Sequence, residues 1–284
     1  MKIFLTGASS YIGKYIILNY LTNGHKVLST SRTNPKINEK KHKWIKHDLS
    51  KKPLNLNRFR PDIVIHLAGS AWMGRSPESY INSNILTTDN LVKSLKGKKI
   101  KKIFYLSTRD VYGDVAERIL VESSPLNNPS IYGYSKLIAE KILLDSFPTI
   151  ILRLPSIIGL GTHGWLNSVS KKLKKNQKID LSNYKFNNFM HASELSKIIS
   201  RLSIAKVKSD IFLVSCSNIV KSIDVVKLLK IKINSNSKIK INKNQKSNYI
   251  ISSKKLNKFY KTMKVEEVVR IYSEELKLKK MYTC

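Results

Sequence analysis

The stretch MKIFLTGASSYIGKYI, residues 1–16, decides the fold. Residues 2–5 form an apolar run typical of a buried strand, and the apolar residues of 11–21 recur with helical spacing. The turn between them carries three small residues at three-residue intervals, Gly7, Ser10 and Gly13. A strand, a tight glycine turn and a helix are the parts of a dinucleotide-binding unit, in which N–H groups at the helix start bind a pyrophosphate. An ordinary strand-to-helix turn remains the alternative at this point, because a glycine pattern alone is weak evidence.

Strands and helices alternate through the first part of the chain. Further buried strands are predicted at 25–30, 44–46, 62–67, 103–107 and 149–154, and long helices at 77–96 and 130–144. This alternation predicts an α/β fold with a Rossmann-type, doubly wound parallel sheet. Shorter helices and strands follow and predict a small C-terminal α+β lobe. We expect an NAD(P)-binding domain at residues 1–155 and a substrate-binding lobe at 156–284, which is built onto the first domain with exchange of strands and helices.

The chain is strongly basic, with 52 Lys and Arg against 19 Asp and Glu and a net charge of +33. A nucleic-acid partner is one explanation of such a charge. However, only nine of these residues are arginine, the side chain that binds phosphates and bases through paired hydrogen bonds, and the lysines are spread along the chain. We therefore expect no specific nucleic-acid partner. A genome rich in A·T base pairs is our hypothesis for the excess of lysine, and a basic surface would still attract an anionic substrate.

The residue at the tip of the second strand selects the cofactor in this kind of fold. An acidic side chain there binds the ribose 2′-OH of NAD, whereas arginine suits the 2′-phosphate of NADP. Arg32 lies at this tip, and residues 26–36 contain no acidic residue. We therefore expect NADP, with NAD as the alternative cofactor.

A tyrosine and a lysine four residues apart, Tyr132 and Lys136, lie on the helix predicted after the fifth strand. This spacing places both side chains on one helix face. A lysine ammonium beside a tyrosine favours the phenolate and would lower the pKa of the tyrosine from about 10 toward neutrality. Thr108, at the end of the fifth strand, would offer a hydroxyl to the same substrate oxygen. The pair is common by chance, and its position after a glycine-turn unit is what indicates acid–base catalysis.

Together these motifs resemble the extended short-chain dehydrogenase/reductase family, whose members are NAD(P)-dependent nucleotide-sugar epimerases, dehydratases and reductases. The matching pieces occur in family order over essentially the whole chain. They are Thr6-Gly7-x-x-Ser10-x-x-Gly13, Asp48-Leu49, His66-Leu67-Ala68-Gly69, Asn84, Ser107-Thr108 with Val111-Tyr112-Gly113, Tyr132-x-x-x-Lys136 with Glu140, Arg153-Leu154-Pro155, and Phe189-Met190-His191.

The resemblance implies a role for each matching residue. The catalytic residues would be Thr108, Tyr132 and Lys136. The cofactor-binding residues would be Gly7, Ser10, Tyr11, Ile12, Gly13, Arg32, Asp48, Leu49, Ala68, Asn84, Lys136 and Pro155. The candidates for substrate binding do not match the family pattern: Arg109 and Ser156 stand where members carry an acid and an asparagine, and His163 lies in a glycine-flanked loop expected to face the cleft, with a packing role as its alternative. No metal site is expected.

One departure from the family pattern narrows the expected activity. Dehydratases of the family carry Thr-Asp-Glu at the end of the active-site strand, whereas Thr108-Arg109-Asp110 puts a permanent cation in the acid position. We therefore expect no 4,6-dehydratase activity. The expected enzyme transfers hydride on a nucleotide sugar, as a C4 epimerase or a 4-keto-sugar reductase. The alternative is a non-catalytic nucleotide-sensing or RNA-associated member of the same fold, which would not need all three catalytic residues.

The remaining expectations concern location and assembly. No apolar run is long enough and free enough of charge to span a membrane. The chain leads directly into a strand, which leaves no room for a signal peptide, and its two cysteines provide no disulfide framework. We therefore expect a cytoplasmic protein without a membrane span. Family members often form homodimers through the helices that carry Asn84 and Tyr132, so a homodimer is the assembly to test.

Overall fold

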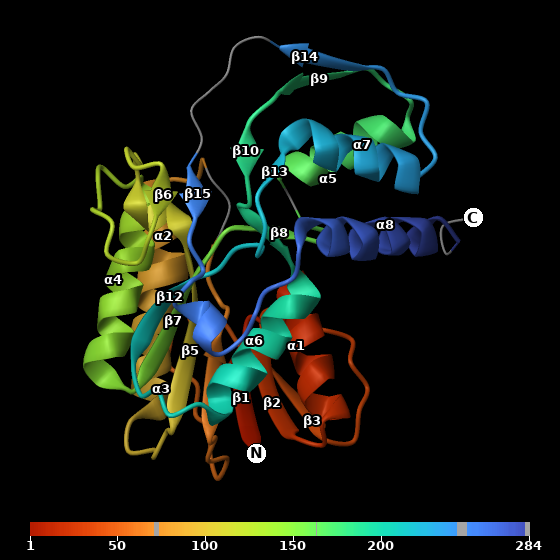
Figure 1. Ribbon diagram of the computed structural model, residues 1–284. Coiled ribbons are helices and arrows are strands. Elements are labelled where there is room, and N and C mark those ends of the chain that lie inside the picture. The colour runs from red at the N-terminus through yellow and green to blue at the C-terminus, as the bar shows by residue number, and fades with distance from the viewer. Residues whose placement is uncertain (71–73, 163, 243–248, 282–284) are drawn as a thin grey trace. The chain divides into compact units, whose positions relative to one another are not determined.

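The computed structural model describes residues 1–70, 74–162, 164–242 and 249–281 (Figure 1). The chain divides into two compact units, which are described separately. Unit 1 comprises Met1–Asp114, Pro125–Leu154 and Ser196–Phe212, and unit 2 comprises Val115–Ser124, Pro155–Leu195 and Leu213–Cys284. The chain passes from unit 1 to unit 2 after Leu154, next to the boundary expected from the sequence. Two shorter segments also change unit: Val115–Ser124 belongs to unit 2, and Ser196–Phe212 belongs to unit 1.

The centre of unit 1 is a parallel sheet. Among the described residues it has seven strands, in the order β12-β7-β5-β4-β1-β2-β3. Their bounds are β1 Lys2–Thr6, β2 Lys26–Ser31, β3 His42–Lys46, β4 Ile63–His66, β5 Lys102–Thr108, β7 Thr149–Leu154 and β12 Asp210–Leu213. Strand β1 pairs in parallel with both β2 and β4, so the strand order reverses on either side of it. The predicted Rossmann-type sheet is confirmed, and its cofactor cleft is expected where the order reverses, at the carboxyl ends of the strands.

Helices cover both faces of this sheet, because its strands are buried on both sides. The helices are α1 Tyr11–Thr22, α3 Thr87–Leu95, α4 Ile131–Ser146 and α6 Ala192–Ile204. On one face, Phe4 and Val64 of the strands share a buried cluster with Leu91 of α3 and Leu143 of α4. The opposite face carries α1 and the part of α6 that belongs to unit 1, which are joined by a 3.2 Å hydrogen bond between the Tyr20 and Ser203 hydroxyls.

The predicted helix at 77–96 is interrupted by a wider turn. It consists of α2 Pro77–Tyr80, a π-helical turn, η1, at Ile81–Leu86, and then α3. The Thr87 hydroxyl donates to the carbonyl of Asn82, five residues earlier, at 3.1 Å. The spacing of apolar residues alone predicts a uniform helix here. It misses the wider turn because that turn depends on buried contacts that Asn84 makes outside the helix.

Helix α4 approaches the end of β5 very closely. Its first turn is capped by the Ser130 hydroxyl, which accepts from the Gly133 N–H at 3.2 Å. A β-carbon on Gly133 would lie 2.5 Å from the Asp110 carbonyl oxygen, in the short 3₁₀ turn η2 at Arg109–Tyr112. Glycine at position 133 therefore lets the helix that carries Tyr132 lie against the turn that follows Thr108.

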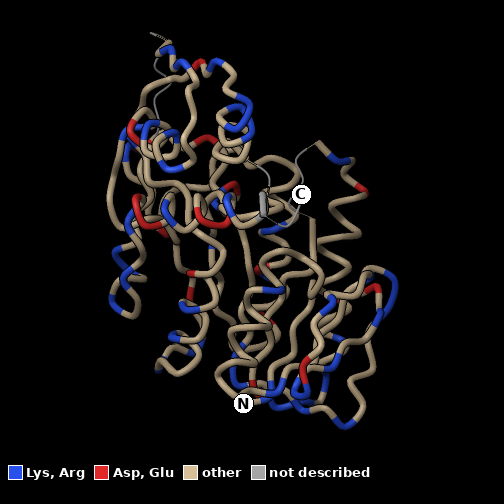
Figure 2. Tube along the Cα trace, turned by 90° about the vertical axis from the view of Figure 1, so that its right-hand side faces the viewer, with Lys and Arg blue, Asp and Glu red and all other residues tan. Residues whose placement is uncertain are grey.

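Unit 2 has its own apolar core, which includes Leu173, Val226, Val268 and Tyr272 from three helices. The helices are α5 Trp165–Lys174, α7 Ser222–Lys232 and α8 Val265–Met281, with a 3₁₀ turn, η3, at Leu256–Lys258. The strands, all paired two by two, are β6 Ile119–Leu120, β8 Ser156–Ile158, β9 Ile179–Ser182, β10 Lys185–Phe186, β11 Phe189–His191, β13 Val220–Lys221, β14 Ile239–Asn242 and β15 Ile250–Ile251. Figure 2 shows lysine and arginine along both units, with fewer acidic residues between them.

Candidate functional site

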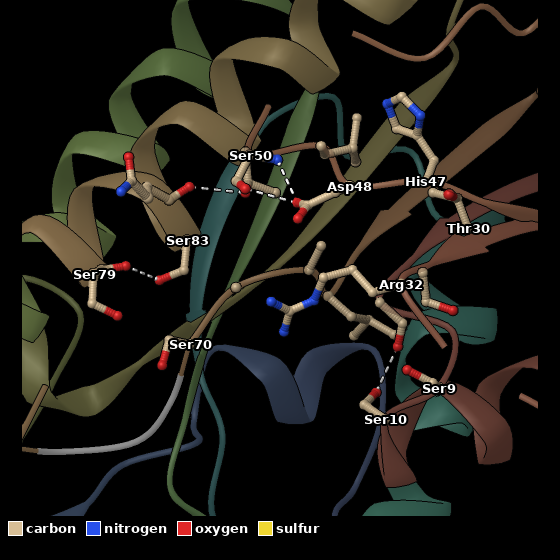
Figure 3. A pocket seen from close by; sticks show the side chains of 18 of the residues that line it. Ser9, Ser10, Thr30, Arg32, His47, Asp48, Ser50, Ser70, Ser79 and Ser83 are labelled. Atoms are coloured by element: carbon tan, nitrogen blue, oxygen red, sulfur yellow. Dashed lines mark hydrogen bonds between the residues drawn. The ribbon is translucent and has the colours of Figure 1, made fainter. Parts of the chain in front are cut away.

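Unit 1 contains a polar cavity of about 550 Å³ at the carboxyl ends of β1, β2 and β4 (Figure 3). It lies where the strand order reverses, as expected for a doubly wound sheet. Six of the residues predicted to bind a cofactor line it: Gly7, Ser10, Arg32, Asp48, Leu49 and Ala68.

The glycine turn forms the floor of this cavity. Gly7 has a positive φ of 74°, and a β-carbon there would lie 2.8 Å from the Ala68 N–H nitrogen. The Ser10 hydroxyl accepts from the Gly13 N–H at 3.0 Å, which caps α1, and donates to the Gly7 carbonyl at 2.8 Å. Without side chains at positions 7 and 13, the turn leaves its backbone and the start of α1 open to a phosphate, so these residues fit a dinucleotide.

Arg32 and Asp48 lie at the end of the cavity formed by β2 and β3. Figure 3 shows the Arg32 guanidinium extending into the cavity. Partial burial raises the pKa of Asp48, but hydrogen bonds from Ser50 and the charges of Arg32 and Lys51 outweigh burial and lower it below its ordinary value. Asp48 is therefore held as a carboxylate close to the arginine.

A buried histidine, His66, stabilises the structure beside the glycine turn. His66 Nδ1 lies 2.7 Å from the Thr6 hydroxyl, and its Nε2 lies 3.0 Å from the Thr88 hydroxyl. The Thr88 hydroxyl donates to the Asn84 carbonyl at 2.6 Å, so it accepts from His66, and Nε2 carries the ring proton. Burial and the nearby Lys136 lower the pKa of His66 to about 3. His66 is thus a neutral structural residue rather than an acid or base.

The predicted catalytic residues lie at the end of β5 and on the first turns of α4. Tyr132 is 7% exposed, its hydroxyl is hydrogen-bonded to Thr108, and its ring lies 5.6 Å from that of Tyr80. The Thr108 hydroxyl also donates to the Asp110 carboxylate at 3.1 Å. Burial and the charge of Asp110 raise the pKa of Tyr132, and the hydrogen bond with Thr108 offsets this only in part. The expectation of a lowered pKa is therefore wrong for the protein without ligands.

The surroundings of Lys136 explain why this lysine does not lower the pKa of Tyr132. Its ammonium is buried, donates to the Leu106 carbonyl at 2.6 Å, and lies 4.1 Å above the ring centre of Tyr105. Burial lowers the pKa of Lys136 to about 7, and the charge of Glu140 offsets this in part. The lysine lies on the same face of α4 as Tyr132, but its charge is engaged with β5 and is reduced near neutral pH.

A buried ion pair anchors this part of α4. Arg153 Nη2 and Glu140 Oε2 lie 2.8 Å apart, and both side chains are almost completely buried. The Ser107 hydroxyl donates to Glu140 as well, and the Arg153 guanidinium lies 4.8 Å above the ring of Tyr112. Strands β5 and β7 are thereby tied to the helix one turn beyond Lys136.

The other predicted site residues have different positions. Tyr11 and Ile12 lie in the first turn of α1 but are not among the residues lining the cavity, and Asn84 is buried behind its wall. Arg109 follows Thr108 directly, with its guanidinium 3.8 Å from the Asp110 carboxylate. Pro155 and Ser156 belong to unit 2, and His163 lies outside the described residues.

One wall of the cavity was not predicted from the sequence. It comes from α2 and the π-helical turn and contributes Ser79, Asn82 and Ser83. The spacing of these three residues, which places small polar side chains on one helix face, was the available signal. Ser70, after β4, also lines the cavity and was not predicted.

Comparison with known protein families assigns the chain. A model described as "NAD dependent epimerase/dehydratase family" matches residues 3–212. The chain belongs to the NAD-dependent epimerase/dehydratase family. The resemblance to extended short-chain dehydrogenases/reductases is thereby confirmed.

Curated relatives show moderate similarity to the chain. A UDP-glucose 4-epimerase from Erwinia amylovora is 30% identical over 187 residues, which are 58% of this chain and 56% of that protein. Protein CapI from Staphylococcus aureus is 25% identical over 234 residues, 71% of this chain and 69% of that protein. The chain spans about half the length of the first two curated relatives it matches.

Solved structures share the fold at lower identity. The Bordetella bronchiseptica enzyme WbmH in complex with NAD+ has a TM-score of 0.82 at 17% identity, covering 97% of this chain and 98% of that one. UDP-glucose 4-epimerase from Thermotoga maritima with UDP-glucose has a TM-score of 0.81 at 17% identity, covering 98% and 99%. At this identity the similarity supports the fold alone. Within the described part of the chain, no helix has the length and apolar character needed to cross a bilayer.

Proposed function

We propose that the protein is an NAD(P)-dependent enzyme that acts on a nucleotide sugar, as a C4 epimerase or a 4-keto-sugar reductase. The observation that carries this proposal is the buried Tyr132 hydroxyl, hydrogen-bonded to Thr108 at the end of β5, in the same unit as a glycine-turn cavity. Family membership and the names of the relatives support the substrate class.

Tyr132 is proposed to exchange a proton with the sugar oxygen. Because burial and Asp110 raise its pKa, Tyr132 is a protonated phenol near neutral pH, ready to donate to a carbonyl oxygen. Thr108 orients the phenol, and Lys136 fixes β5 against α4 and reaches the cofactor ribose. The cofactor, when bound, supplies hydride acceptance and donation at the sugar carbon.

The cofactor is proposed to be NADP, with NAD as the alternative. Arg32 supports NADP because it extends into the cavity at the tip of β2, the place where an acidic residue would bind the 2′-OH of NAD. Gly7 and Ser10 are proposed to hold the pyrophosphate, Ala68 to line the cofactor, and Asp48 and Leu49 to flank the adenine. Tyr11, Ile12, Gly13, Asn84 and Pro155 remain proposals from the family resemblance, as do Arg109, Ser156 and His163 for substrate.

A substrate screen tests the activity. Purified protein with NAD or NADP is incubated with UDP-glucose, UDP-galactose and a nucleotide 4-keto sugar, and products are separated by anion-exchange chromatography. We expect interconversion of the first two or reduction of the third, and no 4-keto-6-deoxy product from UDP-glucose, because Arg109 is permanently charged. Absence of any conversion, together with intact dinucleotide binding, would favour the non-catalytic nucleotide-sensing alternative.

The assembly is proposed to be a homodimer. Helix α4 exposes Ile131, Tyr134 and Ile138 by 54%, 51% and 46%, and their spacing places them on one face of the helix. An exposed apolar stripe of this kind is typical of a protein–protein interface.

A further inference from the structure

Ser70 is a buried residue in the wall of the cavity, four positions after the end of β4. It is 8% exposed, and its hydroxyl oxygen is buried without a hydrogen-bond partner among the residues that the structure describes. Buried hydroxyls in folded proteins almost always have a partner, so an unsatisfied one on a residue that lines a cavity indicates a group that can bond to a ligand.

Asn84 holds the backbone of Ser70 through contacts with both its N–H and its carbonyl group. The Ser70 N–H donates to Asn84 Oδ1 at 2.8 Å, and Asn84 Nδ2 approaches the Ser70 carbonyl at 3.4 Å. Asn84 Nδ2 also donates to the Ser135 hydroxyl at 2.8 Å, which fixes the orientation of the amide. Gly69 makes room for this clamp, because a β-carbon there would lie 2.7 Å from Asn84 Oδ1.

The π-helical turn accounts for the position of Asn84. It places this amide inside the protein, 1% exposed, at the level of the Ser70 peptide. The π-helical turn and the buried amide therefore hold a short segment whose own hydroxyl has no hydrogen-bond partner among the described residues. A preorganised donor costs little reorganisation when a ligand binds.

The sheet order indicates which part of a ligand Ser70 would meet. Arg32 and Asp48 follow β2 and β3, on one side of β1, whereas Ser70 follows β4, on the side of β5 and Thr108. Figure 3 shows Ser70 on one side of the cavity and Ser9 and Ser10 on the other. The adenosine would lie toward β2 and β3, so Ser70 would lie beyond the pyrophosphate.

We propose that the Ser70 hydroxyl donates a hydrogen bond to the ribose–phosphate segment on the nicotinamide side of the bound dinucleotide. This inference rests on the proposed dinucleotide site and adds to it a residue that determines affinity. The removal of the hydroxyl should therefore weaken binding without weakening the ligand-free fold, because the hydroxyl has no hydrogen-bond partner among the described residues.

Calorimetric titration and thermal melting of Ser70→Ala test this. We expect affinity for NAD, or for NADP if that binds more tightly, to fall about threefold to tenfold. Affinity for AMP should stay unchanged, and the melting temperature of the ligand-free protein should stay unchanged or rise. The matched control is Ser146→Ala, a serine of α4 that does not line the cavity and whose hydroxyl donates to the Ile142 carbonyl at 2.7 Å; its dinucleotide affinity should change by less than twofold.

Four outcomes would overturn the inference. Unchanged NAD and NADP affinity would show that the hydroxyl makes no contact, and an equal loss with AMP would place it at the adenosine half. A lower ligand-free melting temperature would show that the hydroxyl has a structural partner. If the wild-type protein bound neither dinucleotide, the proposed function would fail together with this inference, whereas the first three outcomes leave the proposed function standing.

Discussion

Tyr132 and Lys136 lie one helical turn apart, yet their charges are controlled by different neighbours. Burial and Asp110 act on the tyrosine, while the lysine is held against the Leu106 carbonyl and the Tyr105 ring. Both groups are consequently biased toward their neutral forms. A reaction that starts by donating the phenol proton suits this resting state better than one that starts by removing a proton.

Tyr132→Phe should reduce turnover at least about a hundredfold, because it removes the proposed acid–base group. Dinucleotide affinity should change little, since only a hydroxyl is lost. In the wild type, the raised pKa of Tyr132 keeps it protonated below about pH 10. Carbonyl reduction should therefore not lose activity through this group below that pH, whereas sugar oxidation should speed up as pH rises.

The control for this substitution is Tyr134→Phe, a tyrosine two residues away that is 51% exposed on the outer face of α4. The turnover of Tyr134→Phe should match that of the wild type. Near-full activity of Tyr132→Phe with the true substrate would contradict the catalytic role.

Arg32→Ala should lower affinity for NADPH about tenfold to a hundredfold and leave affinity for NADH nearly unchanged, because a charge-assisted bond to the 2′-phosphate is lost. Fluorescence titration with both reduced cofactors measures this. Arg60→Ala, an exposed arginine that does not line the cavity, is the control. Tighter binding of NADH by the wild type would contradict the preference for NADP.

At the scale of the element, α4 has two working faces. Its buried face carries Tyr132, Lys136 and Glu140, and its outer face carries the apolar stripe. Ile138→Lys should convert the proposed homodimer to a monomer, because a lysine would lose its hydration in an apolar interface. Light scattering after size exclusion measures the mass. Ile231→Lys, 74% exposed on α7, should leave the mass unchanged, and a monomeric wild type would contradict the proposal.

Elements also separate what could be predicted from sequence from what could not. The strands around Gly7 and Thr108 were predictable, because fully buried strands appear as continuous apolar runs between turn residues. The π-helical turn at Asn84 was not, since it depends on Ser70 and Ser135, which are distant in sequence. The prediction of a lowered pKa for Tyr132 failed for the same reason. Residue spacing shows that two side chains share a helix face, but not what each of them contacts in the neighbouring elements.

At the scale of the whole molecule, the net charge of +33 opposes compactness through self-repulsion. Salt shortens the range of charge interactions from about 30 Å at 10 mM to about 3 Å at 1 M. We therefore expect the melting temperature to rise with sodium chloride concentration, measured by differential scanning fluorimetry without ligand. Sodium sulfate should raise it further, and a fall with sodium chloride would show that attractive ion pairs dominate.

The interleaving of the two units constrains the order in which a ribosome can complete them. Unit 1 needs Ser196–Phe212, which emerge only after Pro155–Leu195 of unit 2 have been made. Until then, the nascent sheet lacks β12 at one edge and lacks the α6 residues that cover part of one face. The growing chain therefore exposes apolar surface of unit 1 until Phe212 has been made, a stage at which chaperones can bind.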